Sequence, residues 1–247
     1  IFLENSLKTP SRMFEFVFKM FCEGLGVLPK GGIEDISKQL KEKLQSTEIH
    51  YNTLVSKVKN KVITLSNGKK IESHYIIIAT EPSSLVENLK KQQLDWKSCE
   101  NLYFTCANRV YDKSFIGLIS NKESLINNIF YPTSLKTIQR GKSDLISVTV
   151  VKKHGLSEKD LINQVKIELK KECKIENARF LKLYNIPKAL PEINNLQYEI
   201  FPSETKLKDG VFLAGDVLLN GSLNAAIIAG EKAALGVIED IEKTITL

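Results

Sequence analysis

The spacing of apolar residues changes several times along the chain and predicts both helices and strands. Large apolar side chains crowd residues 10–21 on more than one side, which predicts a well-buried helix. Apolar positions at helical spacing over 33–44 predict a second helix. Short apolar runs predict strands at 48–51, 55–58 and 62–65, and Asn67-Gly68 predicts a hairpin turn because this pair tolerates positive φ. The continuous run 75–79 is typical of a strand buried on both faces.

The middle of the chain has a different texture, in which short apolar runs alternate with loops rich in Asn, Ser and Lys. One helix is predicted at 157–172, with Ser157 as its N-cap and Leu161, Val165 and Leu169 on one face. We expect a separate, mostly antiparallel lobe here. Its strands are predicted at 102–108, 116–119, 126–131, 145–151 and 178–186.

The end of the chain returns to α/β character, with a buried strand at 211–214 and a long helix over 222–242. The segment between them combines features of a ligand site. Gly215 lets another group approach the backbone closely, and Asp216 lies where ligands bind in open α/β sheets. Small residues in the next turn (Ser222, Ala225 and Ala226) leave helical N–H groups accessible to a flat, negatively charged ligand. A plain strand–loop–helix unit, packed for its own sake, explains the same spacing equally well.

Composition narrows the class of protein. The chain is 43% hydrophobic, as packed proteins are, and no apolar run reaches the roughly 18 residues that a membrane helix needs. The four cysteines and three histidines are scattered, so we predict reduced thiols, a cytoplasmic protein and no metal site. The net charge of +6 comes from lysines spread over helix faces, which favours solvated surfaces over a nucleic-acid patch.

Five segments, in the order found here, resemble the flavin-containing amine oxidase and phytoene desaturase superfamily. The strand, Gly215-Asp216, short loop and small-residue helix resemble its C-terminal FAD motif. The other four are the Pro29-x-Gly31-Gly32 turn, the strands from Asn52 to the Asn67-Gly68 hairpin, the run 76–82 and the segment 184–191.

The resemblance implies a set of FAD contacts. Asp216 would bond the ribityl–pyrophosphate part, Val55 would meet the adenine through its backbone, and Gly31 and Gly32 would pass close to the flavin ring. Ala79 would end the strand that returns to the dinucleotide-binding sheet. The helix start, Ser222, Leu223, Asn224, Ala225 and Ala226, would face the ring together with Gly215.

The chain departs from the family pattern in two ways. Ala225 replaces a family glycine and adds a methyl group where the flavin should approach. No G-x-G-x-x-G occurs, so the βαβ unit that cradles the FAD pyrophosphate, on the order of 150 residues, is missing. Because the chain also starts without Met, we expect it to be a trimmed or downstream part of a longer protein.

We therefore predict an α/β (overall α+β) fold: a partial, doubly wound FAD-binding domain with an inserted antiparallel substrate lobe. Residues 1–28 would be a helix of the substrate lobe, 29–90 part of the FAD domain, 91–205 the lobe, and 206–247 the last part of the FAD domain. Tyr103, Phe104, Tyr131 and Tyr184 would line the substrate pocket, or belong to the core.

Three functions stay open. The chain could be the C-terminal portion of an FAD-dependent oxidoreductase that oxidises or desaturates a small apolar or amine substrate by hydride transfer. It could be a non-catalytic split subunit that acts as a binding module, or part of a carotenoid-type isomerase that uses reduced flavin. No catalytic base is predicted, because the cofactor supplies the redox step. The expected partners are a small molecule and the missing N-terminal region, with peripheral membrane contact left open.

Overall fold

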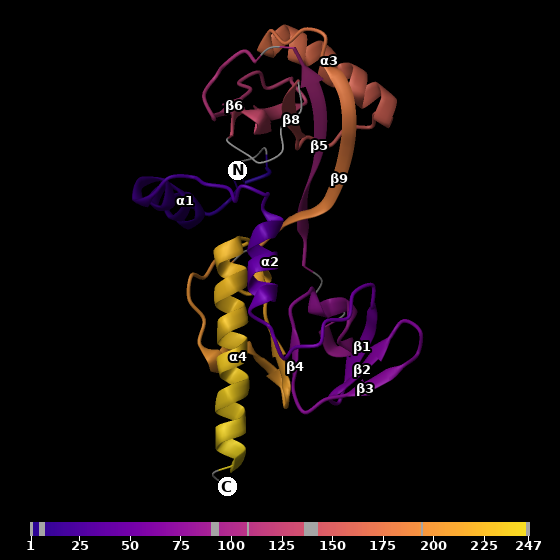
Figure 1. Cartoon of the computed structure of the whole chain (residues 1–247), viewed down its shortest axis with the longest axis vertical. Coiled ribbons are helices and arrows are strands. Elements are labelled where there is room, and N and C mark those ends of the chain that lie inside the picture. Colours follow the sequence, from indigo (N-terminus) through magenta and orange to yellow (C-terminus); the bar gives the residue numbers. More distant parts are fainter. Residues whose placement is uncertain are drawn as a thin grey trace. The chain divides into compact units, whose positions relative to one another are not determined.

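The structure, a computed structural model, describes residues 2–4, 8–89, 94–107, 109–135, 143–193 and 195–245 (Figure 1). It divides into two compact units, each assembled from three stretches of the chain. The first unit is Ile1–Thr9, Phe18–Thr47 and Lys97–Ala189, and the second is Pro10–Val17, Glu48–Trp96 and Leu190–Leu247. Helix α1 (Ser11–Glu23) has residues in both units, and α2 (Glu34–Glu42) belongs to the first.

A five-stranded sheet with the order β6-β7-β8-β5-β9 and one long helix, α3 (Glu158–Cys173), form the body of the first unit. Strand pairs β6–β7, β7–β8 and β8–β5 are antiparallel, which confirms the predicted antiparallel character of this lobe. The strands are β5 (Trp96–Cys106), β6 (Ile116–Leu118), β7 (Ile126–Phe130), β8 (Asp144–Val150) and β9 (Arg179–Pro191).

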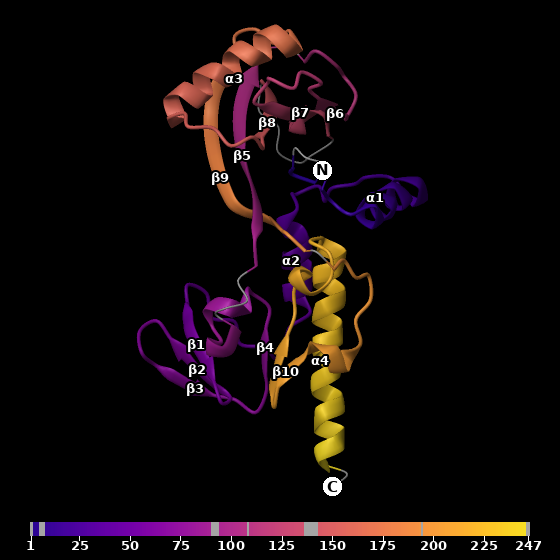
Figure 2. The same ribbon diagram turned by 180° about the vertical axis from the view of Figure 1, so that it is seen from behind.

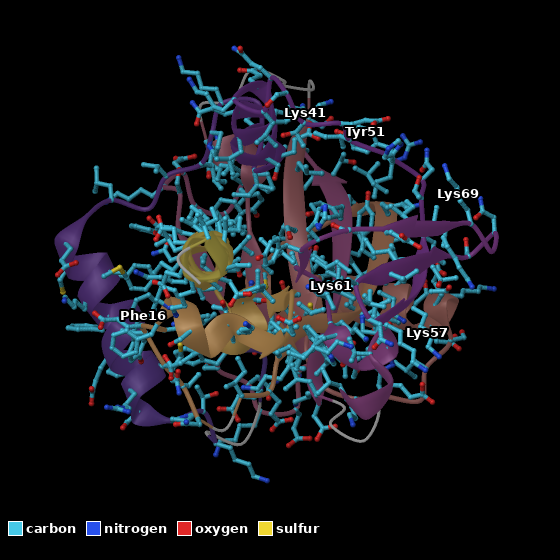
Figure 3. The ribbon with its side chains drawn as sticks, turned by 90° about the horizontal axis from the view of Figure 1, so that it is seen from below. Phe16, Lys41, Tyr51, Lys57, Lys61 and Lys69 are labelled. Atoms are coloured by element: carbon cyan, nitrogen blue, oxygen red, sulfur yellow. The ribbon has the colours of Figure 1, made fainter. Side chains whose placement is uncertain are left out.

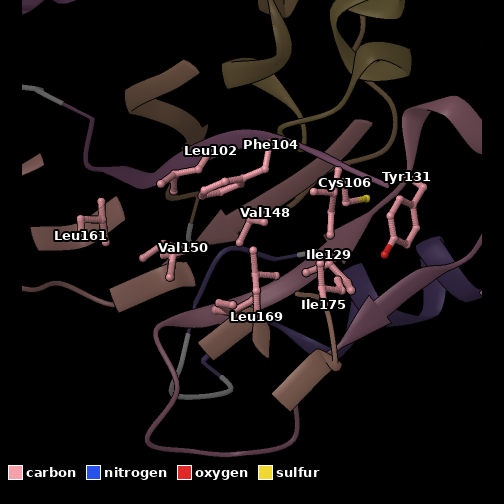
Figure 4. Close-up of a cluster of buried hydrophobic side chains, with 13 residues drawn as sticks. Leu102, Phe104, Cys106, Ile129, Tyr131, Val148, Val150, Leu161, Leu169 and Ile175 are labelled. Atoms are coloured by element: carbon pink, nitrogen blue, oxygen red, sulfur yellow. The ribbon is translucent and has the colours of Figure 1, made fainter. Parts of the chain in front are cut away.

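One face of this sheet packs against α3 (Figure 2). Successive strand residues point to opposite faces, so alternate residues of β5 and β8 reach the helix. Ser157 caps the helix by accepting a hydrogen bond from the Asp160 N–H at 3.2 Å, as predicted. Figure 4 shows the resulting core. It includes Leu102, Phe104 and Cys106 from β5, Ile146, Val148 and Val150 from β8, and Leu161, Val165 and Leu169 from α3.

A buried carboxylate lies on the core-facing side of α3. Glu168 is only 6% exposed. It accepts hydrogen bonds from the Ser124 hydroxyl at 2.6 Å and from the N–H groups of Leu125 and Ile126 at 2.8 and 3.2 Å. Gln164 donates to its other oxygen at 2.9 Å. The carboxylate therefore fixes the turn that leads into β7.

The second unit contains a small antiparallel sheet of β1 (Val55–Lys59), β2 (Val62–Leu65) and β3 (Lys70–Glu72). The Asn67-Gly68 turn is confirmed: Gly68 has φ +83°, and the Asn67 side chain accepts from the Lys69 N–H at 3.0 Å. Lys57 and Lys61, labelled in Figure 3, form ion pairs with Glu87 and Asp209 at 3.3 Å each. Lysines of this sheet are thus partly neutralised by neighbouring carboxylates.

A second sheet in this unit has the order β10-β11-β4, built from β10 (Lys206–Lys208), β11 (Val211–Leu213) and β4 (Ile76–Ile78). Strands β11 and β4 are parallel, with Val211 opposite Ile76. Helix α4 (Leu223–Ile245) contacts β11, and the residues that it buries are all small. These are Ala225, Ala229, Ala233 and Gly236, and a Cβ on Gly236 would lie 2.7 Å from the Pro202 carbonyl oxygen.

Three predictions about strands and burial differ from the structure. Residues 48–51 form no strand, since Tyr51 is 65% exposed and no described segment pairs with them. Helix α1 is present but has no buried residue, so the prediction that it is well buried is wrong. Strand β4 is buried on one face only, because Ile77 is 43% exposed.

Other boundaries move by a few residues. The predicted strand at 102–108 begins earlier, at Trp96, and ends at Cys106, while Asn108 lies outside the described residues. The predicted helix at 33–44 is α2, and the predicted long helix at 222–242 is α4.

Candidate functional site

The candidate site begins where the two parallel strands of the second unit end. The Ala214 N–H donates to the Ile78 carbonyl at 2.8 Å, so Ala79 and Gly215 follow side by side. Gly215 has φ 112° and ψ 163°, a conformation that is essentially restricted to glycine. A Cβ on Gly215 would lie 3.7 Å from the Ala79 carbonyl oxygen, and no other atom would be within 4 Å. The backbone here is open to close approach by another group.

Asp216 opens the short helical turn η5 (Asp216–Leu218), directly after this glycine. Its side chain is half-buried, and burial raises its pKa, while the hydrogen bond from the Val217 N–H opposes that rise. No ion pair to Asp216 is found among the described residues. A half-buried carboxylate without a cation is suited to accepting hydrogen bonds from the hydroxyl groups of a ligand.

A buried amide orders the loop between η5 and α4. Asn220 is 4% exposed, donates to the Gln197 carbonyl at 2.9 Å and accepts from the Ser222 hydroxyl at 2.7 Å. Next to it, Gly221 has φ +33°, and a Cβ there would lie 3.2 Å from the Pro191 ring. Asn220 was not among the candidates predicted from the sequence, and an asparagine in a glycine-containing loop is too common to single it out.

The first turn of α4 leaves two backbone donors available. The Ser222 hydroxyl accepts from the Ala225 N–H at 3.1 Å, and the Ser222 carbonyl accepts from the Ala226 N–H at 3.0 Å. The N–H groups of Leu223 and Asn224 find no partner in the described part of the chain, and both residues are exposed. Together with the helix dipole, these two groups favour a negatively charged or electron-rich ligand.

The methyl group of Ala225 does not face this exposed surface. Ala225 is 1% exposed and lies in a small core with Ile200, Leu219 and Ala229. Its methyl group therefore lies in this core, and the expected effect of Ala225 on a flavin contact stays a prediction. Its spacing from the later buried alanines of α4 gives the physical reason for its burial, because residues four apart share one helix face.

The remaining candidate cofactor residues lie elsewhere. Val55 begins β1, which is an edge strand of its sheet in the second unit, so one side of its backbone has no strand partner. Gly31 and Gly32 belong to the first unit and form the turn before α2. The Gly31 N–H donates to the Asp35 carboxylate at 3.0 Å, and Gly32 has φ +111°.

Only two of the four candidate pocket residues line a hollow. Tyr103 and Tyr184 contribute to an open cavity of about 590 Å³ in the first unit. Phe104 and Tyr131 are fully buried in the core on α3 (Figure 4). Phe104 points into the core against α3, whereas Tyr103, its neighbour on β5, lines the hollow. Burial raises the pKa of Tyr131 to about 12, as expected for a core phenol.

The described residues contain no group of side chains that could hold a metal ion. The four cysteines are unpaired, and burial raises the pKa of the Cys106 and Cys173 thiols, which keeps them protonated. No helix in the described part of the chain is long and apolar enough to cross a membrane.

The fold is a mixed α/β arrangement with antiparallel sheets and one parallel strand pair. Comparison with known families gives the class: the model of the family described as flavin containing amine oxidoreductase matches residues 4–238. The chain therefore belongs to the flavin-containing amine oxidoreductase family. No curated protein matches it significantly by sequence.

Solved structures share this fold at low sequence identity. An oxidoreductase from Methanosarcina mazei is 14% identical, with a TM-score of 0.68 over 96% of this chain and 61% of its own. Putrescine oxidase bound to putrescine is 11% identical, with a TM-score of 0.59 over 84% and 53%. Reduced UDP-galactopyranose mutase is 14% identical, with a TM-score of 0.53 over 72% and 46%. The chain spans about half the length of the structures it matches.

Replacing Asp216 with asparagine is expected to raise the melting temperature of the isolated chain at pH 7. The pKa of Asp216 is raised in the folded state above its ordinary 3.8, so ionisation favours the unfolded chain as pH rises past that value. Asparagine does not titrate and its carbonyl still accepts from Val217. The gain in melting temperature should shrink as pH falls from the raised pKa of the folded state towards 3.8 and be absent below it, and a gain that stays constant from pH 3 to 8 would contradict this reading of Asp216.

Proposed function

We propose that this chain supplies the C-terminal part of the FAD site in a flavin-dependent oxidoreductase. One observation carries the proposal: a parallel strand ends in a glycine-only turn, a half-buried carboxylate follows, and a helix then begins with two N–H groups that have no partner among the described residues. Each feature fits one part of a dinucleotide cofactor.

Different residues would contact different parts of FAD. Asp216 would accept hydrogen bonds from the ribityl–pyrophosphate part, and Gly215 with Ala79 would let it lie close to the backbone. The N–H groups of Leu223 and Asn224 would face the flavin ring, while the exposed edge of β1 at Val55 would meet the adenine. Bound FAD would accept a hydride from the substrate, and the helix start would stabilise the negative charge that the reduced ring carries.

The same site needs a second segment of protein. In the part of the chain that the structure describes, strand β4 pairs with a strand, β11, on one side only, and Ile77 on its face is 43% exposed. In the doubly wound strand order 3-2-1-4-5-6, strand 1 leads into the glycine-rich phosphate loop and lies beside strand 4. In this proposal β4 takes the place of that neighbouring strand. We infer that a strand–G-x-G-x-x-G–helix unit, in the same polypeptide or a partner, adds to β4 and completes the FAD domain. This also fits a chain that spans about half of its structural relatives.

The experiment compares FAD retention by the protein joined to its native upstream region, in three forms. Wild type and Asp209→Ala should copurify with yellow flavin, because Asp209 is an 82% exposed aspartate away from the strand end. Asp216→Ala should lose most of the flavin absorbance. If the wild type takes up no flavin, or if Asp216→Ala retains as much as Asp209→Ala, the proposal fails.

A non-catalytic binding module is the second candidate, and the uncovered β4 edge favours it if no glycine-rich unit ever joins the chain. Anaerobic mixing of the flavin-loaded protein with substrate separates the remaining alternatives. Bleaching of the oxidised flavin band indicates hydride transfer from substrate. Turnover that needs prior reduction of the flavin indicates a redox-neutral isomerase.

A further inference from the structure

The hollow of the first unit lies on the side of the five-stranded sheet away from α3. Tyr103 on β5 points opposite to Phe104, which packs into the core on α3. Tyr103 and Tyr184 meet edge to face, with ring centroids 5.9 Å apart and an interplanar angle of 90°. The walls of the hollow are Asn101, Tyr103, Leu145, Leu181, Lys182, Tyr184, Asn185 and Ile186.

The charge of this hollow comes from one side chain. Lys182 is the single charged residue among the eight that line it, and none of the others is a carboxylate. Its ammonium group lies 5.9 Å from the centroid of the Tyr184 ring. Among the described residues it has no carboxylate partner. A ligand in this hollow therefore meets apolar surface, two amides and an uncompensated positive charge.

We propose that the hollow binds a flat apolar molecule that carries a carboxylate, and that it discriminates against amines. The inference rests on the proposed function in that this molecule would be the substrate, or a substrate-like ligand, of the flavin site. Its carboxylate would pair with Lys182, and its apolar body would lie against Tyr103, Tyr184 and Leu145.

Two features of the lining disfavour an ammonium ligand. Its charge would be repelled by Lys182, with no carboxylate in the lining to compensate. The face of Tyr184, which could otherwise attract a ligand cation, already has the Lys182 ammonium above it. A cationic diamine such as putrescine, which is bound in one of the matched structures, would need negative groups around it. The lining of this hollow has none.

The test uses three probes with one ring system and different charges: 2-naphthylacetate, 2-(2-naphthyl)ethanol and 2-(2-naphthyl)ethylamine. Each is titrated into the full chain, and binding is followed by NMR through the ring protons of Tyr103 and Tyr184. We expect the acid to bind about fivefold to tenfold more tightly than the amine, with the alcohol between them.

Variants assign this preference to one charge. Lys182→Gln should bring the three affinities to within about twofold of each other, and Lys182→Glu should reverse their order. Lys159→Gln, an exposed change on α3 and thus on the other side of the sheet, should keep the wild-type preference. Tyr184→Leu should weaken all three probes together, since it removes the shared apolar contact.

The outcomes separate this inference from the FAD proposal. Preference for the acid in a chain that never takes up flavin would support the hollow and overturn the FAD site. Flavin uptake with equal affinities, with a preference for the amine, or with a preference that Lys182→Gln leaves unchanged would overturn the hollow alone. Probes that perturb neither Tyr103 nor Tyr184 would also overturn it.

Discussion

Replacing Glu168 with alanine is expected to lower the free energy of unfolding of the first unit by about 3 kcal/mol, since buried donors left unsatisfied cost about 1–3 kcal/mol each. The Leu125 N–H, which donates to Glu168 at 2.8 Å, would have no other acceptor among the described residues, and Gln164 and Ser124 would each lose a carboxylate bond. The Ile126 N–H would still donate to the Ser124 hydroxyl oxygen at 3.1 Å. The loss is therefore smaller than four broken bonds would suggest.

Urea unfolding followed by near-ultraviolet circular dichroism measures this loss, because tyrosines of the first unit report its packing. Glu172→Gln is the matched control: Glu172 lies one turn further along α3, and one of its partners is Asn121 at 2.9 Å. The urea midpoint of Glu172→Gln should lie close to that of wild type. The urea midpoint of Glu168→Gln should lie between those of wild type and Glu168→Ala. The amide keeps one acceptor, but its NH2 group would face the hydrogen-bond donors that surround Glu168. An unchanged midpoint for Glu168→Ala would show that the turn is held by other contacts.

Glu168 also shows where sequence reasoning ends. The predicted core face of α3 was correct for Leu161, Val165 and Leu169, because apolar spacing reflects the helix period directly. Glu168 lies next to Leu169 and is buried with it, yet a pattern of hydrophobic and polar residues predicts that a glutamate faces solvent. Its burial depends on the turn at 124–126, which is distant in the sequence and reaches Glu168 only in the folded unit.

Errors in the predicted burial have a different origin. The pattern of α1 and β4 predicts covered surfaces, but Phe14 is 58% and Ile77 43% exposed. Local pattern reports which surfaces need a partner, and it does not report whether the partner lies within the same chain. The exposed Ile77 of β4 is therefore consistent with a protein that spans about half the length of its relatives.

The candidate site was predicted in part, for reasons of local geometry. Gly215, Asp216 and the helix start follow one another along the chain, so their order alone places them at one strand end. The contribution of Asn220 and the charge of Lys182 required the folded structure, because each acts through residues that the sequence does not connect. Tyr103 and Phe104 were both candidates for the pocket, but only Tyr103 lines the hollow, since Phe104 packs into the core on α3.

Replacing Gly215 with alanine is expected to destabilise the second unit by about 1–3 kcal/mol, the usual cost of a backbone conformation that only glycine adopts readily. The cause is the backbone and not crowding. Gly215 has φ 112° and ψ 163°, whereas the nearest atom to a new Cβ, the Ala79 carbonyl oxygen, would be at an ordinary contact distance of 3.7 Å. The chain can relieve the strain only by rotating the peptide that aims Asp216.

Gly230→Ala, in α4 of the same unit, is the matched control, because a Cβ there would meet nothing within 4 Å. It should stabilise the chain by roughly 0.5–1 kcal/mol through helix propensity. Thermal unfolding by circular dichroism at 222 nm compares the two variants. In the protein with its upstream region, Gly215→Ala should also reduce FAD retention, whereas Gly230→Ala should not. Equal melting temperatures for the two variants would mean that the turn at Gly215 adopts an ordinary conformation, and the geometry proposed for the FAD site would lose its basis.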